Sequence, residues 1–485
     1  MNKILFTHSY FYKFDPKSWQ MKQPYPPLGT ILAAAVIRQE GYHVALFDTN
    51  LKDSPNDIIP VINEFAPQYL VVYDDCFNYL TKMCLTNMRE AAFEMIKIGK
   101  NNGCIVIISS SDSTDHYQKY LDQGADYVIR GEAEATLKEL INHLEIPNAD
   151  IQYIAGVYCR EGDHPFYQRT LISDLDSLPM PAWDLIDMES YRSIWVNGNR
   201  QFTLNIATTR GCQYRCNWCA KPIYGYSYKS RSPEKVIDEI SFLMDNYNAR
   251  EFWMCDDIFG QKPNWLNEFN SLTKKRELCF GYIIQTRADL LQDEKTVQWL
   301  AESGCKKVWM GAESGSQKIL DAMNKGVKVE QIGVALRLLK KYGIKTAFFI
   351  QLGYLNETKE DIDLSIKMIL DLMPGEIGIS VSYPLPGTPY YEKVKKDLQE
   401  KSNWTDSNDL DMMFVNNYSS EFYRQLYKYI HRRFNYKKSI SILKDSVSNL
   451  NFFNRVFVKN CAKIVYMAPL CVMDKIKLNK LGKKT

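Results

Sequence analysis

The sequence contains no continuous apolar run of the roughly 20 residues that a membrane-spanning helix needs. Its opening residues, MNKILFTHSYFY, hold one lysine and then a strand-like run that His8 and Ser9 interrupt, so the long apolar segment of a secretory signal is also missing. Both absences predict a cytoplasmic protein. Nine of the twelve cysteines are scattered, and in a large chain without a secretion signal thiols serve metals, catalysis or packing more often than disulfides.

The net charge of +3 is small, but it is unevenly distributed along the chain. Residues 421–485 carry fifteen Lys or Arg against three acidic residues, which gives this tail +12 and leaves −9 for residues 1–420. Basic residues alternate there with aromatic and aliphatic ones, as in a solvated helical face, a membrane-binding surface, or a site for an acidic substrate or nucleic acid. We expect a solvated face, with peripheral membrane contact as the alternative and no nucleic acid as a partner.

A length of 485 residues predicts two or three structural units, because domains usually span about 100 to 200 residues. Residues 1–145 alternate short apolar runs, such as KILFTH, HVALFD and CIVIISSS, with helical patterns. This alternation predicts an N-terminal Rossmann-like domain of the α/β class, with a doubly wound parallel sheet. A ligand of such a sheet binds at the carboxyl ends of its strands.

A second β/α series follows a predicted connector, residues 146–200, in which the segment LDSLPMPAWDLID marks a boundary. Residues 201–395 contain six strand candidates: TLNIATTR, EFWMCDD, FGYIIQTR, KKVWMGAES, KTAFFIQLG and EIGISVSYPL. Six such units predict a partial (β/α)6 barrel whose working face is formed by the loops after the strands. Residues 396–485 are expected to form a mostly helical, basic C-terminal segment of short helices.

Three cysteines follow the first barrel strand in the segment RGCQYRCNWC, as Cys212, Cys216 and Cys219. Thiolates are soft ligands for iron or zinc, and three in one loop can surround a single metal centre. Structural zinc usually takes four protein ligands, and no fourth Cys or His lies within thirty residues downstream. We therefore expect an iron–sulfur cluster with one iron that the protein leaves open.

This cysteine spacing, with the polar motifs at the later strand ends, resembles the radical S-adenosylmethionine superfamily over about residues 200–395. The resemblance implies that the cysteines hold a 4Fe-4S cluster whose open iron chelates the amino and carboxylate groups of S-adenosylmethionine. The motifs are CNWC, MCDDIF, QTRAD and GAESG, followed by MNKG. The residues expected to contact S-adenosylmethionine are Trp218, one of Asp256 and Asp257, Arg287, Glu313 and Ser314.

Residues 1–145 resemble the cobalamin-binding domain that precedes the barrel in one large branch of this superfamily. Small residues at strand ends would let a corrin and its nucleotide tail lie against the backbone. The D-x-H-x-x-G signature of a histidine axial ligand is absent, so cobalamin is expected to bind without one; loss of the cofactor is the alternative. The expected contacts are Pro27, Leu28, Gly29, Ser110, Ser111, Asp112, Gly131 and Glu132.

The resemblance implies an enzyme that uses a 5′-deoxyadenosyl radical and an electron donor such as flavodoxin or ferredoxin. We expect a methyltransferase acting on an unactivated carbon of a small-molecule or lipid-like metabolite. A cobalamin-dependent cyclase or rearrangement enzyme is the alternative, because the family uses the same cofactors for both. A more remote alternative is a zinc-containing protein that binds nucleic acid or a membrane.

Overall fold

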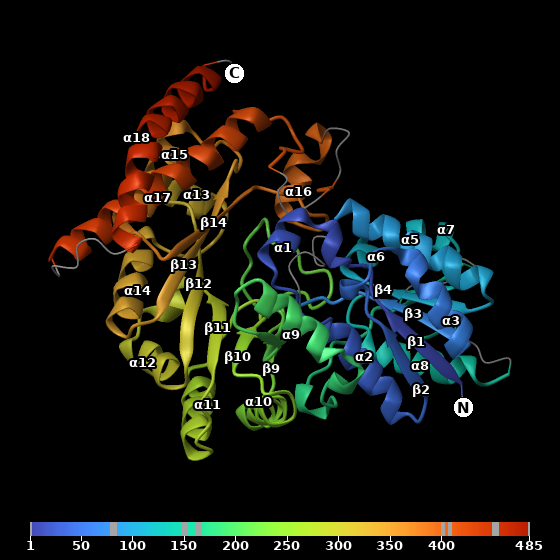
Figure 1. The fold of residues 1–485 in the computed structure, drawn as a ribbon. Helices are drawn as coiled ribbons and strands as arrows, with labels where there is room; N and C mark the ends of the chain where they lie inside the picture. Colours follow the sequence, from blue (N-terminus) through green and yellow to red (C-terminus); the bar gives the residue numbers. More distant parts are fainter. Residues whose placement is uncertain are drawn as a thin grey trace.

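The structure is a computed structural model that describes residues 2–77, 85–147, 151, 153–160, 167–398, 403–405, 410–448 and 455–483. Parts of the predicted connector, at 148–150, 152 and 161–166, therefore lie outside the described residues. The described chain forms two six-stranded sheets followed by two long helices (Figure 1). The first sheet, called the front sheet below, comes from the N-terminal part of the chain, and the second comes from the middle of the chain.

The front sheet has the strand order β2-β1-β3-β4-β5-β6, and every neighbouring pair is parallel except β5 with β6. Side chains alternate between its two faces, so Leu5 packs against one helical layer while Ile4 and Phe6 pack against the other. The predicted doubly wound sheet is confirmed. Its strands are β1 (Lys3–Thr7), β2 (His43–Phe47), β3 (Tyr69–Tyr73), β4 (Ile105–Ser109), β5 (Tyr127–Ile129) and β6 (Val157–Cys159). Its helices are α2 (Leu28–Gln39) and α8 (Glu134–Leu144) on one face, and α3 (Ile59–Phe65), α5 (Thr86–Asn101) and α7 (Tyr117–Asp122) on the other.

The second sheet is wholly parallel, in the order β14-β13-β12-β11-β10-β7, and its six strands fall on the six predicted segments. It is open between β14 and β7, as expected of a partial barrel. The strands are β7 (Leu204–Ile206), β10 (Glu251–Met254), β11 (Gly281–Thr286), β12 (Cys305–Glu313), β13 (Lys345–Leu352) and β14 (Glu376–Val381). The larger helices between them are α10 (Pro233–Tyr247), α11 (Pro263–Lys275), α12 (Glu294–Glu302), α14 (Val329–Lys341) and α15 (Lys359–Leu372).

The front sheet meets the barrel through the segment before α2 and through α9 (Met188–Asn197), which lies between the two sheets in Figure 1. The Trp195 indole of α9 donates to the Pro24 carbonyl at 2.8 Å, and the Asn205 amide of β7 donates to the Pro26 carbonyl at 3.0 Å. The carboxyl edge of the front sheet is thus held beside the first strand of the barrel.

The C-terminal segment departs from the expected short helices, because it forms two long ones, α17 (Ser420–Ser448) and α18 (Arg455–Leu481). They pack against each other, and α17 also contacts α15 and the edge strand β14. Among the described residues, α18 is the one helix with the length and mean hydropathy (1.5 over 18 residues) of a membrane span. The sequence predicted none because lysines interrupt its apolar run.

Candidate active site

The cysteine loop begins at a turn that only glycine can make. Gly211 has a φ of 75°, and a Cβ there would lie 2.4 Å from the Ser227 carbonyl oxygen. Cys212 and Cys216 are buried and Cys219 is half-buried. Burial, with smaller effects from Asp257 and from the other two thiols, raises the pKa of Cys219 to about 12, so the three sulfurs are neighbours.

This arrangement suits a cluster better than a single ion. Within the described residues, no group of three His, Cys, Asp or Glu side chains is placed to hold one metal ion. Structural zinc usually takes four protein ligands, whereas a 4Fe-4S cluster with one open iron takes three thiolates, as this loop can supply. Bound iron would deprotonate these thiols and oppose the burial that raises the pKa of Cys212 and of Cys219.

Of the two aspartates after β10, the structure favours Asp257 as the site residue. Asp256 is 1% exposed, and one of its carboxylate oxygens accepts the backbone N–H groups of Thr208 and Thr209 at 2.7 and 2.8 Å. Burial raises the pKa of Asp256 to about 6. Asp256 therefore holds the backbone at Thr208 and Thr209, just before the cysteine loop. Asp257 lies beside the thiols of Cys212 and Cys219.

Two buried cations face the cysteine loop from the barrel. Arg287 follows β11; it lies 3.9 Å from the Cys216 sulfur and its guanidinium stacks 3.6 Å from the centre of the Tyr214 ring. Lys325 is 7% exposed and its ammonium group donates to Glu313 at 2.8 Å. Sequence reasoning gave Lys325 no role, although its MNKG segment was noted. Arg287 also pairs with Asp289 at 2.9 Å, so a ligand carboxylate beside the cysteines would share these two cations with Asp289 and Glu313.

Glu313 and Ser314 have different surroundings at the end of β12. Glu313 has a φ of 58°, a left-handed backbone that is rare outside glycine and typical of functional sites. Ser314 is fully buried, and its hydroxyl lies 3.0 Å from the Ser365 hydroxyl of α15 while accepting the Ser316 N–H at 3.1 Å. Ser314 thus fastens the strand end to a helix, and Glu313 remains the candidate for ligand contact.

Two buried polar atoms around this space have no hydrogen-bond partner within the described residues: Trp218 Nε1 and Gln351 Oε1. Trp218 lies in the cysteine loop, and Gln351 lies at the carboxyl end of β13. Buried polar groups are normally paired, so these atoms fit a polar ligand. Together with the two cations, they fit S-adenosylmethionine.

The loop after β13 is closed by a buried acid. Glu357 is fully buried, accepts the Gly353 N–H at 2.7 Å and has a pKa raised by burial to about 8. The Gly353 carbonyl accepts from the Asn416 amide at 2.7 Å. This backbone is therefore engaged within the protein.

Glu132, expected beside cobalamin, instead joins the front sheet to the cysteine loop. Arg210, two residues before Cys212, pairs with Glu132 at 2.5 Å and with Glu134 at 2.6 Å, and all three side chains are about 5% exposed or less. The Arg210 guanidinium also lies 5.3 Å from the centre of the Tyr224 ring. Sequence reasoning missed this triad, whose members lie 76 and 78 positions apart.

The first group of predicted cobalamin contacts forms the start of α2. Pro27 precedes the helix, Leu28 is 2% exposed, and the Gly29 N–H donates to Asp75 at 3.2 Å. A Cβ on Gly29 would lie 3.4 Å from the Asp75 Cα, so glycine allows a close approach of two backbones. Only the edge of this turn is left for a ligand.

The other predicted contacts lie after β4 and β5. Ser110 and Ser111 begin the short helix α6 (Ser111–Asp115), where Ser110 caps the first turn. Asp112 pairs with Arg89 at 2.5 Å; burial alone would raise the pKa of Asp112, but this pairing holds it below the usual range. Gly131, with a φ of 78°, leaves space where a side chain would be, as a ligand lying on the backbone needs.

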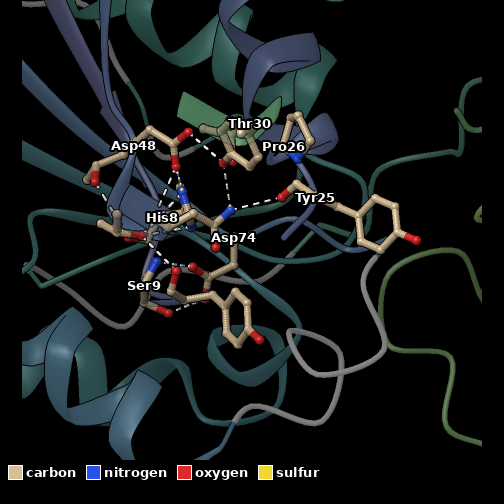
Figure 2. Close-up of polar contacts among 12 residues, drawn as sticks. His8, Ser9, Tyr25, Pro26, Thr30, Asp48 and Asp74 are labelled. Atoms are coloured by element: carbon tan, nitrogen blue, oxygen red, sulfur yellow. Dashed lines mark hydrogen bonds and ion pairs between the residues drawn. The ribbon is translucent and has the colours of Figure 1, made fainter. Parts of the chain in front are cut away.

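The carboxyl edge of β1 to β3 carries a polar network in which His8 is held tightly (Figure 2). The His8 ring lies 2.9 Å from Asp48 through Nε2 and 2.9 Å from the Thr49 hydroxyl through Nδ1, and Ser9 donates twice to Asp74. Both ring nitrogens are engaged. His8 is therefore fixed within this polar network.

Two asparagines hold the segment before α2, at the boundary between the front sheet and the barrel. The Asn50 amide donates to the Tyr25 carbonyl at 2.9 Å and the Asn205 amide to the Pro26 carbonyl at 3.0 Å (Figure 2 labels Tyr25 and Pro26). Each asparagine leaves its own oxygen buried and unpaired within the described residues. Two free acceptors beside this edge fit a group rich in amide donors, such as a corrin with its side chains.

The barrel face opposite the helices is lined by aromatic side chains. Along β12, Val308 and Met310 are buried under helices, whereas Trp309 points to the other face and stays half-buried. Trp309 stacks on Phe349 of β13, which is 37% exposed, with ring centres 4.6 Å apart. Gly378 of β14 lies beside them, and a Cβ there would come within 3.2 Å of the Trp309 ring. This face can accept a flat apolar ligand.

Comparison with known proteins agrees with the site. The model of the Radical SAM superfamily matches residues 206–369. An uncharacterized methyltransferase of Pyrococcus horikoshii is 26% identical over 453 residues, which cover 91% of this chain and 95% of that protein. The anaerobic magnesium-protoporphyrin IX monomethyl ester cyclase of Rubrivivax gelatinosus is 28% identical over 405 residues, covering 81% of this chain and 70% of that one.

Two solved structures share the whole arrangement of front sheet and barrel. The cobalamin-dependent S-adenosylmethionine radical enzyme OxsB, with aqua-cobalamin bound, has a TM-score of 0.74 at 18% identity and covers 99% of this chain and 72% of its own. The radical S-adenosylmethionine methyltransferase TsrM of Kitasatospora setae, with cobalamin and a [4Fe-4S] cluster, has a TM-score of 0.67 at 18% identity, covering 82% and 75%. Residues 206–369 thus match the Radical SAM superfamily, and the chain shares the fold of solved cobalamin-dependent radical S-adenosylmethionine enzymes.

Proposed function

We propose that the chain is a cobalamin-dependent radical S-adenosylmethionine enzyme that methylates an unactivated carbon of an apolar small-molecule or lipid-like substrate. The observation that carries the proposal is the grouping of three neighbouring thiols with the buried cations Arg287 and Lys325. The resemblance to the uncharacterized methyltransferase of Pyrococcus horikoshii over 95% of that protein's length supports methyl transfer.

When bound, the cluster and S-adenosylmethionine supply a 5′-deoxyadenosyl radical that removes a hydrogen atom, and methylcobalamin supplies the methyl group. The protein's own part is to bind and orient. Arg287 and Lys325 hold a carboxylate close to Cys216, and Glu313, kept in place by Lys325, accepts hydrogen bonds from hydroxyl or amino groups. The burial of these side chains keeps water away from a reactive radical.

The aromatic face of the barrel supports the choice of an apolar substrate. Trp309 and Phe349 offer stacked rings, and Gly378 leaves the neighbouring strand without a side chain. The charged side chains Lys307 and Glu376 pair with each other at 2.6 Å near the amino ends of the strands, away from the cysteines. A flat hydrocarbon or ring system would bury these rings.

The remaining partners follow from the same chemistry. The cluster needs one electron from a donor such as flavodoxin or ferredoxin, and Cys219, half-buried, lies at the more open part of the loop. We place the enzyme in the cytoplasm, in contact with a membrane through its C-terminal segment. An apolar substrate would favour that location.

The test uses protein purified and reconstituted without oxygen, with dithionite, S-adenosylmethionine, methylcobalamin and a panel of apolar ring compounds. Methyl transfer consumes two molecules of S-adenosylmethionine, so both 5′-deoxyadenosine and S-adenosylhomocysteine should accumulate. Release of 5′-deoxyadenosine alone would contradict methyl transfer. A Trp309→Ala variant should lose product formation while retaining iron, whereas an exposed Tyr153→Ala variant should keep both.

A cyclase or rearrangement enzyme is the second candidate, because the Rubrivivax gelatinosus relative is a cyclase that matches 81% of this chain. It would give 5′-deoxyadenosine and a product without an added methyl group. Mass spectrometry of the product, with S-adenosylmethionine labelled in its methyl group, separates the two outcomes.

A further inference from the structure

Helix α18 has an unusual distribution of apolar residues, because it presents them on two opposite faces. One face packs inward and includes Asn460, Cys471, Leu478 and Leu481, all buried. The other face is open along nearly the whole helix. Its exposed apolar residues are Val458 (57%), Val465 (76%), Val472 (61%) and Ile476 (52%), with Tyr466 (69%) and Met473 (62%) beside them.

The spacing shows that these residues form one stripe. Val458, Val465 and Val472 recur every seven residues and Ile476 follows four later, which places all four on one side of an α-helix. Six large exposed apolar side chains on the outer side of one helix are more than scattered surface residues would give. Such a patch marks an interaction site.

Lysines lie near both ends of the stripe. Lys459 and Lys463 lie in the first half of the helix and Lys475, Lys477 and Lys480 in the last part, whereas the stretch from 464 to 473 has no charged residue. Residues 421–485 as a whole carry +12. An apolar centre between lysines is the pattern of a helix that lies in the headgroup region of an anionic bilayer.

Helix α17 excludes a transmembrane arrangement of α18. The two helices pack along each other, and Asp474 of α18 accepts from the Gln425 amide of α17 at 3.0 Å and also pairs with Arg432. Crossing a bilayer would take the basic side chains of α17 into hydrocarbon, at high cost. Lying flat, α18 keeps α17 in water and turns only its stripe toward the lipid.

We propose that the outer stripe of α18 docks this protein on the surface of an anionic lipid bilayer, with the helix parallel to the membrane. The seven-residue spacing would also suit a second copy of the chain, packed against the stripe as in a coiled coil. Two copies joined through this stripe would bring the lysines of both helices together, and Pro469 lies within the stripe, so charge and shape favour the bilayer.

The test measures co-sedimentation of the full-length protein with vesicles of phosphatidylcholine containing phosphatidylglycerol, and with vesicles of phosphatidylcholine alone. It needs no substrate or turnover, so its outcome is independent of the proposed reaction. The protein should pellet with the anionic vesicles, and high salt should weaken this binding. Failure of the protein to bind anionic vesicles would overturn the proposal.

A double variant, Val465→Asn with Val472→Asn, should weaken vesicle binding about tenfold or more, because two valines would no longer enter the lipid. Both side chains are largely exposed, so the fold should be unchanged, as circular dichroism can check. The control is Val196→Asn, a valine of α9 with 58% exposure, which should bind as the wild type does. Membrane docking would be refuted if the double variant bound vesicles as well as the wild type does. It would also be refuted if light scattering showed that the wild type is a dimer and the double variant a monomer.

Discussion

Replacing Arg210 by methionine tests whether the buried triad holds the two sheets together. The change leaves Glu132 and Glu134 facing each other in a dry interface, where the Ile172 N–H also donates to Glu132. Removing one partner of a buried ion pair costs about 3–5 kcal/mol. We expect the free energy of the first unfolding transition in urea, followed by tryptophan fluorescence, to fall by that amount.

The matched control is Arg276→Met, which breaks an exposed pair with Asp238. Its cost should be about 0–1 kcal/mol, because solvent screens surface pairs. A triple variant that combines Arg210→Met with Glu132→Gln and Glu134→Gln should regain about half of the loss, since no uncompensated charge remains. Equal costs for Arg210→Met and Arg276→Met, or a triple variant as unstable as the single one, would refute the reasoning.

Three further outcomes are expected. Cys219→Ser should abolish the brown iron–sulfur absorbance and the bound iron of reconstituted protein, whereas Cys279→Ser, at an exposed cysteine, should leave both unchanged. Lys325→Met leaves Glu313 buried without its partner and should weaken S-adenosylmethionine binding about tenfold in equilibrium dialysis, while Lys295→Met at an exposed site should not. Burial raises the pKa of Glu357 to about 8, so the folded protein keeps a proton on Glu357 that the unfolded chain releases. The free energy of unfolding should therefore fall by at most about 1.4 kcal/mol per pH unit as the pH rises toward 8, and level off above that pH. The variant Glu357→Gln should flatten this slope in urea titrations.

Features that depend on local pattern were predictable from the sequence. All six barrel strands were located, because alternating or continuous apolar runs bounded by helices have a simple physical cause. The three cysteines were found because eight residues contain them all. The choice between Asp256 and Asp257 could not be made, since neighbouring side chains at a strand end point in opposite directions and only the fold decides which is inside.

Features that depend on distant residues were not predictable. Arg210 meets Glu132 and Glu134 only when the front sheet docks on the barrel, and one sequence carries no signal of that contact. The length of the two C-terminal helices is not predictable for a related reason. A helix that is apolar on both faces, as α18 is, lacks the single stripe by which amphipathic helices are recognised.

The position of the acidic pair in the chain bears on how the protein matures. Glu132 and Glu134 lie in the front part of the chain, which leaves the ribosome before the loop of Cys212, Cys216 and Cys219 and can fold first. Arg210 then emerges onto a ready-made anchor, two residues ahead of the first thiol. A circular permutant that places the front sheet last would have to load its metal onto a loop without this anchor.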